Sequence, residues 1–228
     1  MKLTKNRKQI LENIDFNKVY EPLDAIKILK EKSFVKFNET IDVSINLGID
    51  TNKSDQNIKG VTNLPNGSGK NIKVAVISSP DKHKEASDNN ADIIGSNELI
   101  EQIEKKIEFD MLIATPDMMP LLGKVAKILG PKGLMPNPKL GTVTKDIGTA
   151  VKNAKSGQVK YKNDKSGIVH AGIGKLDFSE EKIIENLKSL YSSVVKSKPD
   201  TVKGSFVKKV SIASTMGIGL QINQSSLR

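Results

Sequence analysis

The sequence contains no cysteine and no tryptophan, and it has only two histidines and two arginines. The absence of cysteine excludes disulfides, thiolate metal sites and cysteine nucleophiles. With only His83 and His170 present, histidine-rich metal sites and most Ser-His catalytic arrangements are excluded as well. His170 lies in an alternating segment with no evident partner base, nucleophile or metal set, which favours a structural or surface role.

Long apolar runs are also missing. No stretch approaches the roughly 20 apolar residues that cross a bilayer. The basic segment 1–14 lacks the continuous apolar core of a secretory signal. Apolar residues make up 37% and charged residues 27% of the 228 residues, which is typical of a soluble globular protein. We therefore expect a cytoplasmic protein without a membrane anchor.

Positive charge is in excess, because 36 Lys and Arg against 26 Asp and Glu give a formal net charge of +10. Residues 68–158 hold 13 Lys and 11 acidic residues, a net of +2, which leaves +8 for the rest of the chain. Residues 1–10 and 201–228 contain no acidic residue. A basic surface built from both chain ends predicts a polyanionic partner. Nucleic acid is favoured over membrane because no basic helix has a large apolar aromatic face.

Segments near both ends of the chain alternate polar and apolar residues, which predicts strands with one buried face. The expected strands are 40–47, 60–64, 158–161, 168–173 and 205–214. Helical spacing predicts helices over 4–14, from Pro22 to about residue 30, and over 179–196, where Ser179 begins a sequence similar to a capping box. Strands with amphipathic helices packed on one side predict an α+β arrangement.

The middle of the chain has a different pattern, in which short apolar strands alternate with helices. The expected strands are 73–77, 92–95 and 111–114, and the expected helices are 83–90, 97–106 and about 118–129. This alternation predicts βαβ units and a parallel sheet. We predict a discontinuous α+β domain from residues 1–67 and 159–228, with an α/β domain inserted at 68–158. Gly67, Gly69 and Gly157 at the two crossings are the predicted hinge.

Two glycine-containing motifs are candidates for ligand sites. Residues 66–70 (Asn-Gly-Ser-Gly-Lys) are similar to a phosphate-binding loop, but the first glycine position holds Leu64 and the magnesium-binding Ser/Thr position holds Asn71. The Gly130–Lys139 loop is rigid and carries two lysines, but it is no dinucleotide fingerprint. The residues therefore favour neither an enzyme nor a cofactor site, although an enzyme of nucleotide metabolism and a general nucleic-acid chaperone stay open as alternatives.

The C-terminal strand is the more informative segment. It carries small hydroxyl residues at alternate positions and ends in Thr215, Met216 and Gly217. Small side chains and glycine let a sugar-phosphate backbone approach closely, and hydroxyls reach 2′-OH groups. An ordinary edge strand with a glycine turn explains this segment equally well. Phe37 presents the same choice between a core residue and an exposed stacking surface.

Several strings taken together resemble the L-one family of bacterial large-subunit ribosomal proteins, and the similarity spans the whole chain. They are FNETIDVSINLGID, ATPDMMPLLGKVAKILGPKGLMPNPKLGTVT, YKNDKSGIVHAGIGKLDF and STMG. The resemblance implies a split α+β RNA-binding domain that carries an inserted Rossmann-like three-layer α/β domain, with no enzymatic activity and no cofactor. It also implies binding to a mobile stalk of large-subunit ribosomal RNA, help in releasing deacylated tRNA from the exit site, and repression of the protein's own operon mRNA. We expect a monomer when the protein is free.

Carried over residue by residue, the resemblance also implies the RNA contacts. They are Lys36, Phe37, Thr40, Asp164, Lys165, Lys209, Ser211, Thr215, Met216 and Gly217. Glu39 is expected to orient its neighbours or to contact 2′-OH groups rather than phosphate. Ile218 stands where the family usually has Pro, which leaves the backbone path of the tail less fixed. We expect recognition of RNA shape rather than of base sequence.

Overall fold

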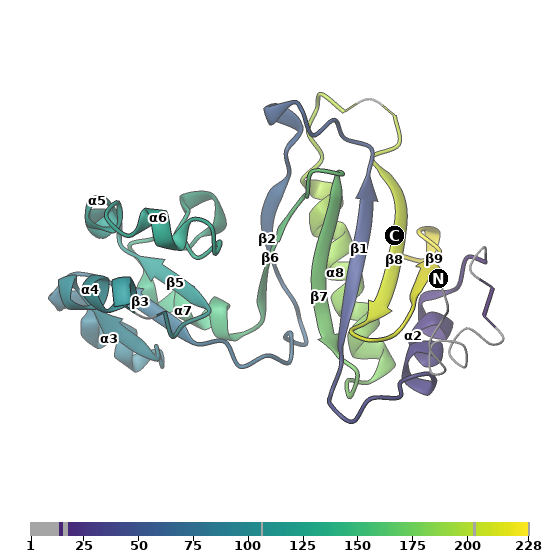
Figure 1. Ribbon diagram of the computed structural model, residues 1–228, viewed down its shortest axis with the longest axis horizontal. Helices are drawn as coiled ribbons and strands as arrows, with labels where there is room; N and C mark the ends of the chain where they lie inside the picture. Colours follow the sequence, from purple (N-terminus) through teal and green to yellow (C-terminus); the bar gives the residue numbers. More distant parts are fainter. Residues whose placement is uncertain (1–13, 16–17, 106, 203, 228) are drawn as a thin grey trace. The chain divides into compact units, whose positions relative to one another are not determined.

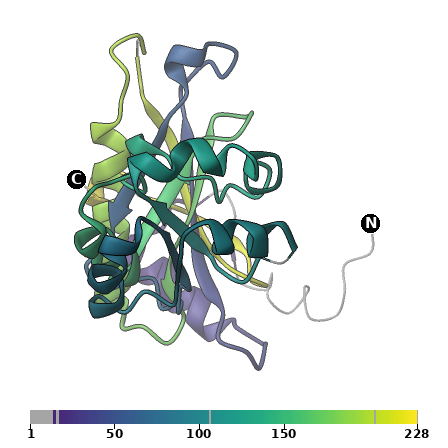
Figure 2. The same ribbon diagram turned by 90° about the vertical axis from the view of Figure 1, so that its left-hand side faces the viewer.

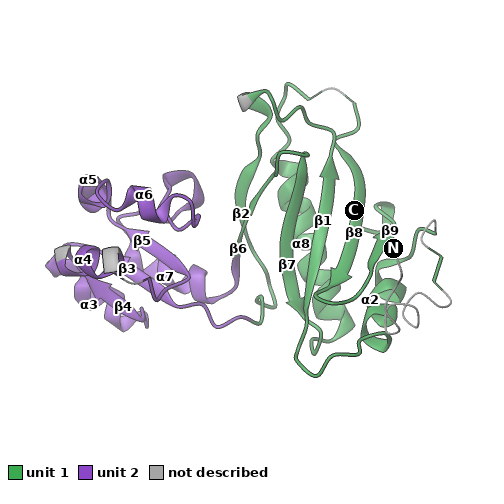
Figure 3. Ribbon diagram, viewed as in Figure 1, with its two compact units in different colours: residues 1–69, 159–228 green, residues 70–158 purple. Residues whose placement is uncertain are grey.

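The computed structural model of the chain describes residues 14–15, 18–105, 107–202 and 204–227. The helix predicted over 4–14 therefore lies outside the described residues, apart from Ile14, and so do the basic residues of the first ten positions. The described chain is a mixed α/β fold, as predicted. It separates into two compact units, residues 1–69 with 159–228 and residues 70–158 (Figure 3). That these units are domains joined by a glycine hinge stays a prediction.

The first unit is built on a four-stranded antiparallel sheet in the order β7-β1-β8-β9 (Figure 1). The strands are β1 (Thr40–Leu47), β7 (Ile168–Lys175), β8 (Val207–Ser214) and β9 (Gly219–Ile222). Strand β1 has the bounds that its alternation predicts, because Ile41, Val43 and Ile45 are fully buried while the polar residues between them face away from the core. The sheet therefore has one apolar and one polar face.

Two helices cover the apolar face, α2 (Pro22–Glu31) and α8 (Glu180–Lys196). Ser179 occupies the N-cap position of α8, but its side chain makes no capping hydrogen bond, so the predicted capping interaction is absent. Glu180 and Glu181 in the first turn complement the helix dipole instead. No helix among the described residues of the first unit packs on the polar side of this sheet. In Figure 1 the sheet lies in front of α8, and we call its polar side the open face.

A two-stranded sheet of β2 (Lys59–Asn63) and β6 (Gln158–Lys162) leads to and from the second unit. Hydrogen bonds from hydroxyl groups join this two-stranded sheet to α8. The hydroxyl of Tyr161 donates to the carbonyl of Ser193 at 3.1 Å, and Ser193 Oγ donates to Thr62 Oγ1 at 2.9 Å. The pair of strands therefore belongs to the first unit by its contacts.

The second unit has a parallel sheet in the order β4-β3-β5, from β3 (Val74–Ile77), β4 (Ile93–Gly95) and β5 (Met111–Ala114). Helices α3 (His83–Asp88) and α7 (Ile147–Lys155) pack on one face, and α4 (Asn97–Lys105), α5 (Met119–Leu122) and α6 (Ala126–Leu129) pack on the other (Figure 1 and Figure 2). The short 3₁₀ helices of the chain are η1 (Ser54–Gln56), η2 (Pro80–Lys82), η3 (Pro116–Met118), η4 (Pro138–Leu140) and η5 (Ser225–Leu227).

The single helix predicted over about 118–129 is wrong. The segment is divided into η3, α5 and α6, and Gly123 follows the last residue of α5. Between α5 and α6 the backbone makes i→i+3 hydrogen bonds, such as that from the Val125 N–H to the Leu122 carbonyl at 3.2 Å, so the turns continue without one α-helix. The apolar residues Leu122, Val125 and Leu129 still face the core at near-helical spacing, which is why the sequence pattern resembles one continuous helix.

Candidate nucleic-acid interface

Three chain segments meet where β1 begins, at what we call the loop end of the sheet: residues 33–40, 175–178 and 214–217. Thr215 Oγ1 accepts a hydrogen bond from the backbone N–H of Thr40 at 3.0 Å and donates one to the Thr40 carbonyl at 3.3 Å. Lys175 Nζ donates to Thr40 Oγ1 at 3.0 Å. The residues predicted at the start of β1 and at the end of β8 therefore lie side by side.

A buried carboxylate fixes the backbone of this loop end. Glu39 is 1% exposed. Its Oε1 accepts the backbone N–H of Met216 at 2.8 Å, and its Oε2 accepts the hydroxyl of Ser33 at 2.9 Å. Because both oxygens are used inside the protein, Glu39 orients its neighbours, and its buried carboxylate is not presented to 2′-OH groups.

Three large apolar side chains are exposed on these segments, and one of them, Phe34, is 46% exposed. Phe37 and Met216 are each 54% exposed. Phe37 is two residues from Glu39, and the Met216 backbone is bonded to Glu39, so both side chains stand on a fixed backbone. Aromatic and apolar surfaces of this kind are suited to stacking on bases and sugars. Lys36 is exposed beside Phe37 and adds positive charge.

The turn after β8 is tight at Gly217, where a larger residue would require the Ser214 hydroxyl to move. The Gly217 N–H donates to the carbonyl of Ser214 at 3.1 Å, and a Cβ added at Gly217 would collide with Ser214 Oγ. The next residue, Ile218, is buried in the hydrophobic core of the first unit. The expectation that Ile218 leaves the tail less fixed stays a prediction.

The other predicted contact residues do not lie at the loop end. Lys209 is paired with Asn46 near the far end of β1, and Ser211 is opposite Ser44 in the middle. Asp164 and Lys165 precede β7, also at the far end. The seven residue steps of β1 span about 23 Å at roughly 3.3 Å per residue. The predicted residues therefore form two groups connected by the open face.

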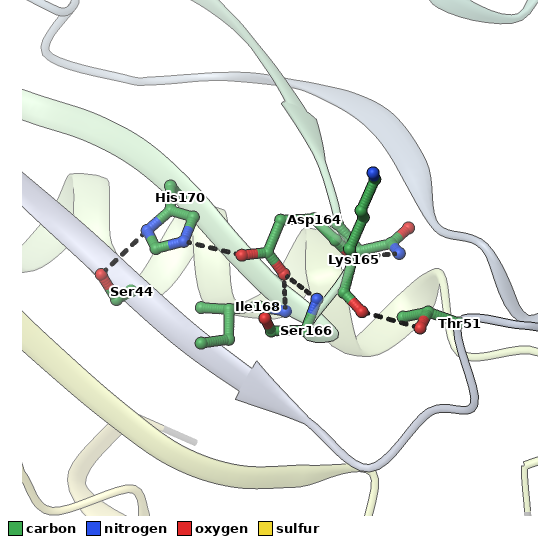
Figure 4. Close-up of polar contacts among 8 residues, drawn as sticks. Ser44, Thr51, Asp164, Lys165, Ser166, Ile168 and His170 are labelled. Carbon is green, nitrogen blue, oxygen red and sulfur yellow. Dashed lines mark hydrogen bonds and ion pairs between the residues drawn. The ribbon is translucent and has the colours of Figure 1, made fainter.

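His170 has partners that the sequence did not reveal (Figure 4). Its Nδ1 lies 3.1 Å from Ser44 Oγ, and its Nε2 lies 3.6 Å from Asp164 Oδ2. These contacts at an exposed position agree with the expected structural or surface role of His170, and they add a carboxylate neighbour that was not evident in the sequence. Ser44 and His170 meet only because β1 and β7 pair in this register. The sequence offered one signal for this contact: Ser44 and His170 each occupy a polar position of a strand that alternates polar and apolar residues.

Asp164 organises the turn between β6 and β7. Its Oδ1 accepts the backbone N–H groups of Ile168 and Ser166, both at 2.8 Å (Figure 4). The hydrogen bond from Ile168 is the main cause that holds the pKa of the Asp164 carboxyl below its ordinary value, and the bonds from Ser166 and His170 lower it further. Asp164 therefore holds the turn that carries Lys165, whose side chain is exposed. A contact of Asp164 itself with RNA stays a prediction.

The lowered pKa of Asp164 predicts how the turn responds to acid. An NMR titration of the Asp164 carboxyl is expected to give a pKa below the ordinary value of about 3.9. Because the pKa is lower in the folded protein, the carboxylate stabilises the turn above the unfolded value, and this contribution is lost as the pH falls through the folded value. The amide shifts of Ser166 and Ile168 should follow the same titration curve. In Asp164→Asn these two amide shifts should no longer change with pH over this range. A pKa at or above 3.9 would contradict this.

Other kinds of site find no support in the part of the chain that the structure describes. Within those ranges no group of three or more His, Asp or Glu residues could hold a metal ion. None of the helices formed by the described residues is long and apolar enough to span a membrane. The basic excess, the polar sheet face and the exposed apolar side chains of the loop end together define a candidate nucleic-acid-binding protein.

Comparison with known proteins identifies the family. The profile of the Ribosomal protein L1p/L10e family matches residues 29–218. The chain is 51% identical over 227 residues to the large ribosomal subunit protein uL1 of Actinobacillus succinogenes, and 51% identical over 227 residues to that of Mannheimia succiniciproducens. Each alignment covers 99% of both chains. The chain belongs to the Ribosomal protein L1p/L10e family.

Family membership decides the class of function. The family consists of structural ribosomal proteins, so the chain is an rRNA-binding component of the translation machinery and not an enzyme. It works in the ribosome, and therefore in the cytoplasm.

Proposed function

We propose that the chain is a structural constituent of the large ribosomal subunit that binds the mobile stalk of the large-subunit RNA near the exit site. The names of the two relatives support the subunit, because both are large-subunit proteins. The observation that carries the RNA surface is the loop end, where Phe37 and Met216 are exposed on segments joined through the buried carboxylate of Glu39.

Recognition in this proposal depends on shape. The loop end contacts an irregular RNA fold through Phe37, Met216 and backbone groups, and the open face follows the RNA with hydroxyls such as Ser44 and Ser211. The exposed lysines 36, 165 and 209 contact phosphates and add a salt-dependent part of the affinity.

We also propose that the two compact units act as domains. Residues 1–67 and 159–228 form a split α+β sandwich that holds the RNA, and 68–158 form an inserted Rossmann-like three-layer α/β domain. The proposed hinge is Gly67, Gly69 and Gly157, whose φ angles are 70°, 68° and 101°. Positive φ is accessible to glycine at little cost, so these positions are suited to a sharp change of chain direction.

The same surface serves two further roles in the proposal. On the ribosome, the stalk-bound protein assists release of deacylated tRNA from the exit site. When ribosomal RNA is scarce, the free monomer binds a stalk-like fold in its own operon mRNA and represses translation. Because one surface binds both RNAs, stalk rRNA and operator mRNA are expected to compete for the protein, and a ternary complex of the two would contradict the proposal.

The loop end can be tested by substitution. Met216→Asp and Thr215→Ala are each expected to weaken binding to a stalk RNA by more than about 1 kcal/mol. The first places a negative charge against RNA, and the second removes the hydroxyl that bonds Thr40. Filter binding at fixed salt measures both. Leu23→Asp on α2 is the matched control, because Leu23 is 38% exposed and the charge change is the same. Unchanged affinity in both variants would exclude this surface.

A general structured-RNA-binding protein or chaperone is the second candidate. It is favoured by the basic residues that are distributed over both chain ends. Such a protein would bind duplex DNA about as well as structured RNA, since phosphate contacts carry no sequence information. Competition between stalk RNA and duplex DNA at fixed salt separates the two, and only stalk binding predicts a strong preference for the RNA.

A further inference from the structure

A cavity of about 550 Å³ lies in the first unit beside the last turns of α8. Its walls come from α8, from the connection that leads to β8 and from the C-terminal segment around η5. The volume falls within the roughly 300–1,000 Å³ of small-ligand sites. The cavity is where β8 begins, whereas the loop end is where β8 ends, so the two are about 23 Å apart at roughly 3.3 Å per strand residue. It is therefore distinct from the interface described above.

Apolar side chains form part of the cavity wall. Phe206 and Leu227 line it and are 7% and 1% exposed. Val195 also lines it and is 40% exposed, which makes it one of the few large hydrophobic side chains with this much contact with water. An aromatic ring with aliphatic neighbours is a suitable surface for a planar, partly apolar group.

The cavity wall also carries a phenolic hydroxyl and two ammonium groups. Tyr191 lines it and is 5% exposed, yet its hydroxyl makes no hydrogen bond with any described residue. Lys196 and Lys198 line it as well, and neither forms an ion pair within the described chain. No Asp or Glu is among the lining residues. Among the described residues, the buried side-chain oxygens without a partner are those of Ser78, Thr115 and Ser214, so the Tyr191 hydroxyl is open to the cavity and can bond to a ligand there.

We propose that this cavity binds one unpaired nucleotide of a single-stranded RNA segment. The base packs on Phe206 and Val195, the Tyr191 hydroxyl bonds to the base or the ribose, and the two lysines pair with the phosphate. A nucleotide has both the planar group and the anion that this lining requires. The proposal uses the RNA-binding character of the family but not the loop end.

The test is an NMR titration of the ¹⁵N-labelled full chain with single-stranded oligouridylate and oligoadenylate. RNA is expected to shift the amide signals of Val195 and Phe206 and the ring signals of Tyr191. Lys196→Ala/Lys198→Ala is expected to weaken this binding by about fivefold or more, through loss of phosphate contacts. Val195→Glu, at an exposed position that tolerates a charge, is expected to weaken it similarly.

The matched control is Lys182→Ala/Lys188→Ala, which removes the same charge from exposed positions of the same helix. These residues are about 21 and 12 Å from Lys196 at roughly 1.5 Å per helical residue. Equal weakening by the two double variants would overturn the site, and so would the absence of shifts at the cavity with either oligomer. Shifts with 5′-UMP, 5′-AMP or inorganic phosphate but not with the oligomers would overturn the RNA assignment. The shifts of Val195, Phe206 and Tyr191 report on the cavity alone, which separates this site from the loop end.

Discussion

Replacing Asn186 by Leu is expected to lower the free energy of unfolding of the first unit by about 3 kcal/mol. Asn186 is a fully buried polar residue of α8. Its Nδ2 donates to the carbonyl oxygens of Ile173 at 2.7 Å and Gly67 at 3.0 Å, and its Oδ1 accepts the N–H of Asn66 at 3.1 Å. Leucine has a similar volume but no polar atoms. The substitution therefore leaves one donor and two acceptors without this partner in the interior.

Urea denaturation followed by tyrosine fluorescence measures this effect in the first unit alone. The chain has no tryptophan, and Tyr20, Tyr161 and Tyr191 all lie in that unit. The control is Ser189→Ala on the same helix, which removes one hydrogen bond to the carbonyl of Asn63 and should cost only about 0.5–1 kcal/mol. An Asn186→Leu variant as stable as this control would contradict the prediction. Because Asn186 bonds to Asn66 and Gly67, the variant also loosens the turn that contains Gly67 of the proposed hinge.

Replacing Glu39 by Leu is expected to reduce affinity for stalk RNA by about 2 kcal/mol, because hydrogen bonds to a charged group contribute about 1.5–3 kcal/mol each. The buried carboxylate joins Ser33 to the backbone of Met216. Without it, the segments that carry Phe37 and Met216 are no longer held together. Removing a negative charge from a protein of net charge +10 would otherwise strengthen RNA binding. A loss of affinity therefore opposes the general electrostatic trend.

Two controls separate positioning from charge in a filter-binding titration at fixed salt. Glu39→Gln keeps the shape and one acceptor, and its amide can donate to the Ser33 hydroxyl, so it is expected to restore most of the affinity. Glu31→Leu removes the same charge at an exposed position of α2 and should not weaken binding. If Glu39→Leu binds as tightly as the unchanged protein, Glu39 does not position the RNA surface.

Local patterns predicted the elements of the fold well. The strict alternation over 40–47 predicted β1 with its correct bounds, and apolar residues at helical spacing predicted α8 to within one residue. Both succeed because the period of the side chains reflects burial on one face of a strand or helix. The same reasoning failed over about 118–129, where core-facing residues kept helical spacing although the backbone is interrupted at Gly123. The family-specific strings indicate the family from the sequence alone.

The sequence by itself therefore determined the strands, most helices, the basic excess and the family. The strands and helices follow from local periodicity, the basic excess from composition, and the family from sequence similarity. Only the tertiary structure decided which of these residues meet. Thr40 bonds to Thr215, Glu39 to Met216 and Ser44 to His170 across separations of 175, 177 and 126 residues. Such contacts are set by strand order and register, which arise from the packing of the whole sheet on α2 and α8. No local pattern encodes them, since the same alternation is compatible with many pairings.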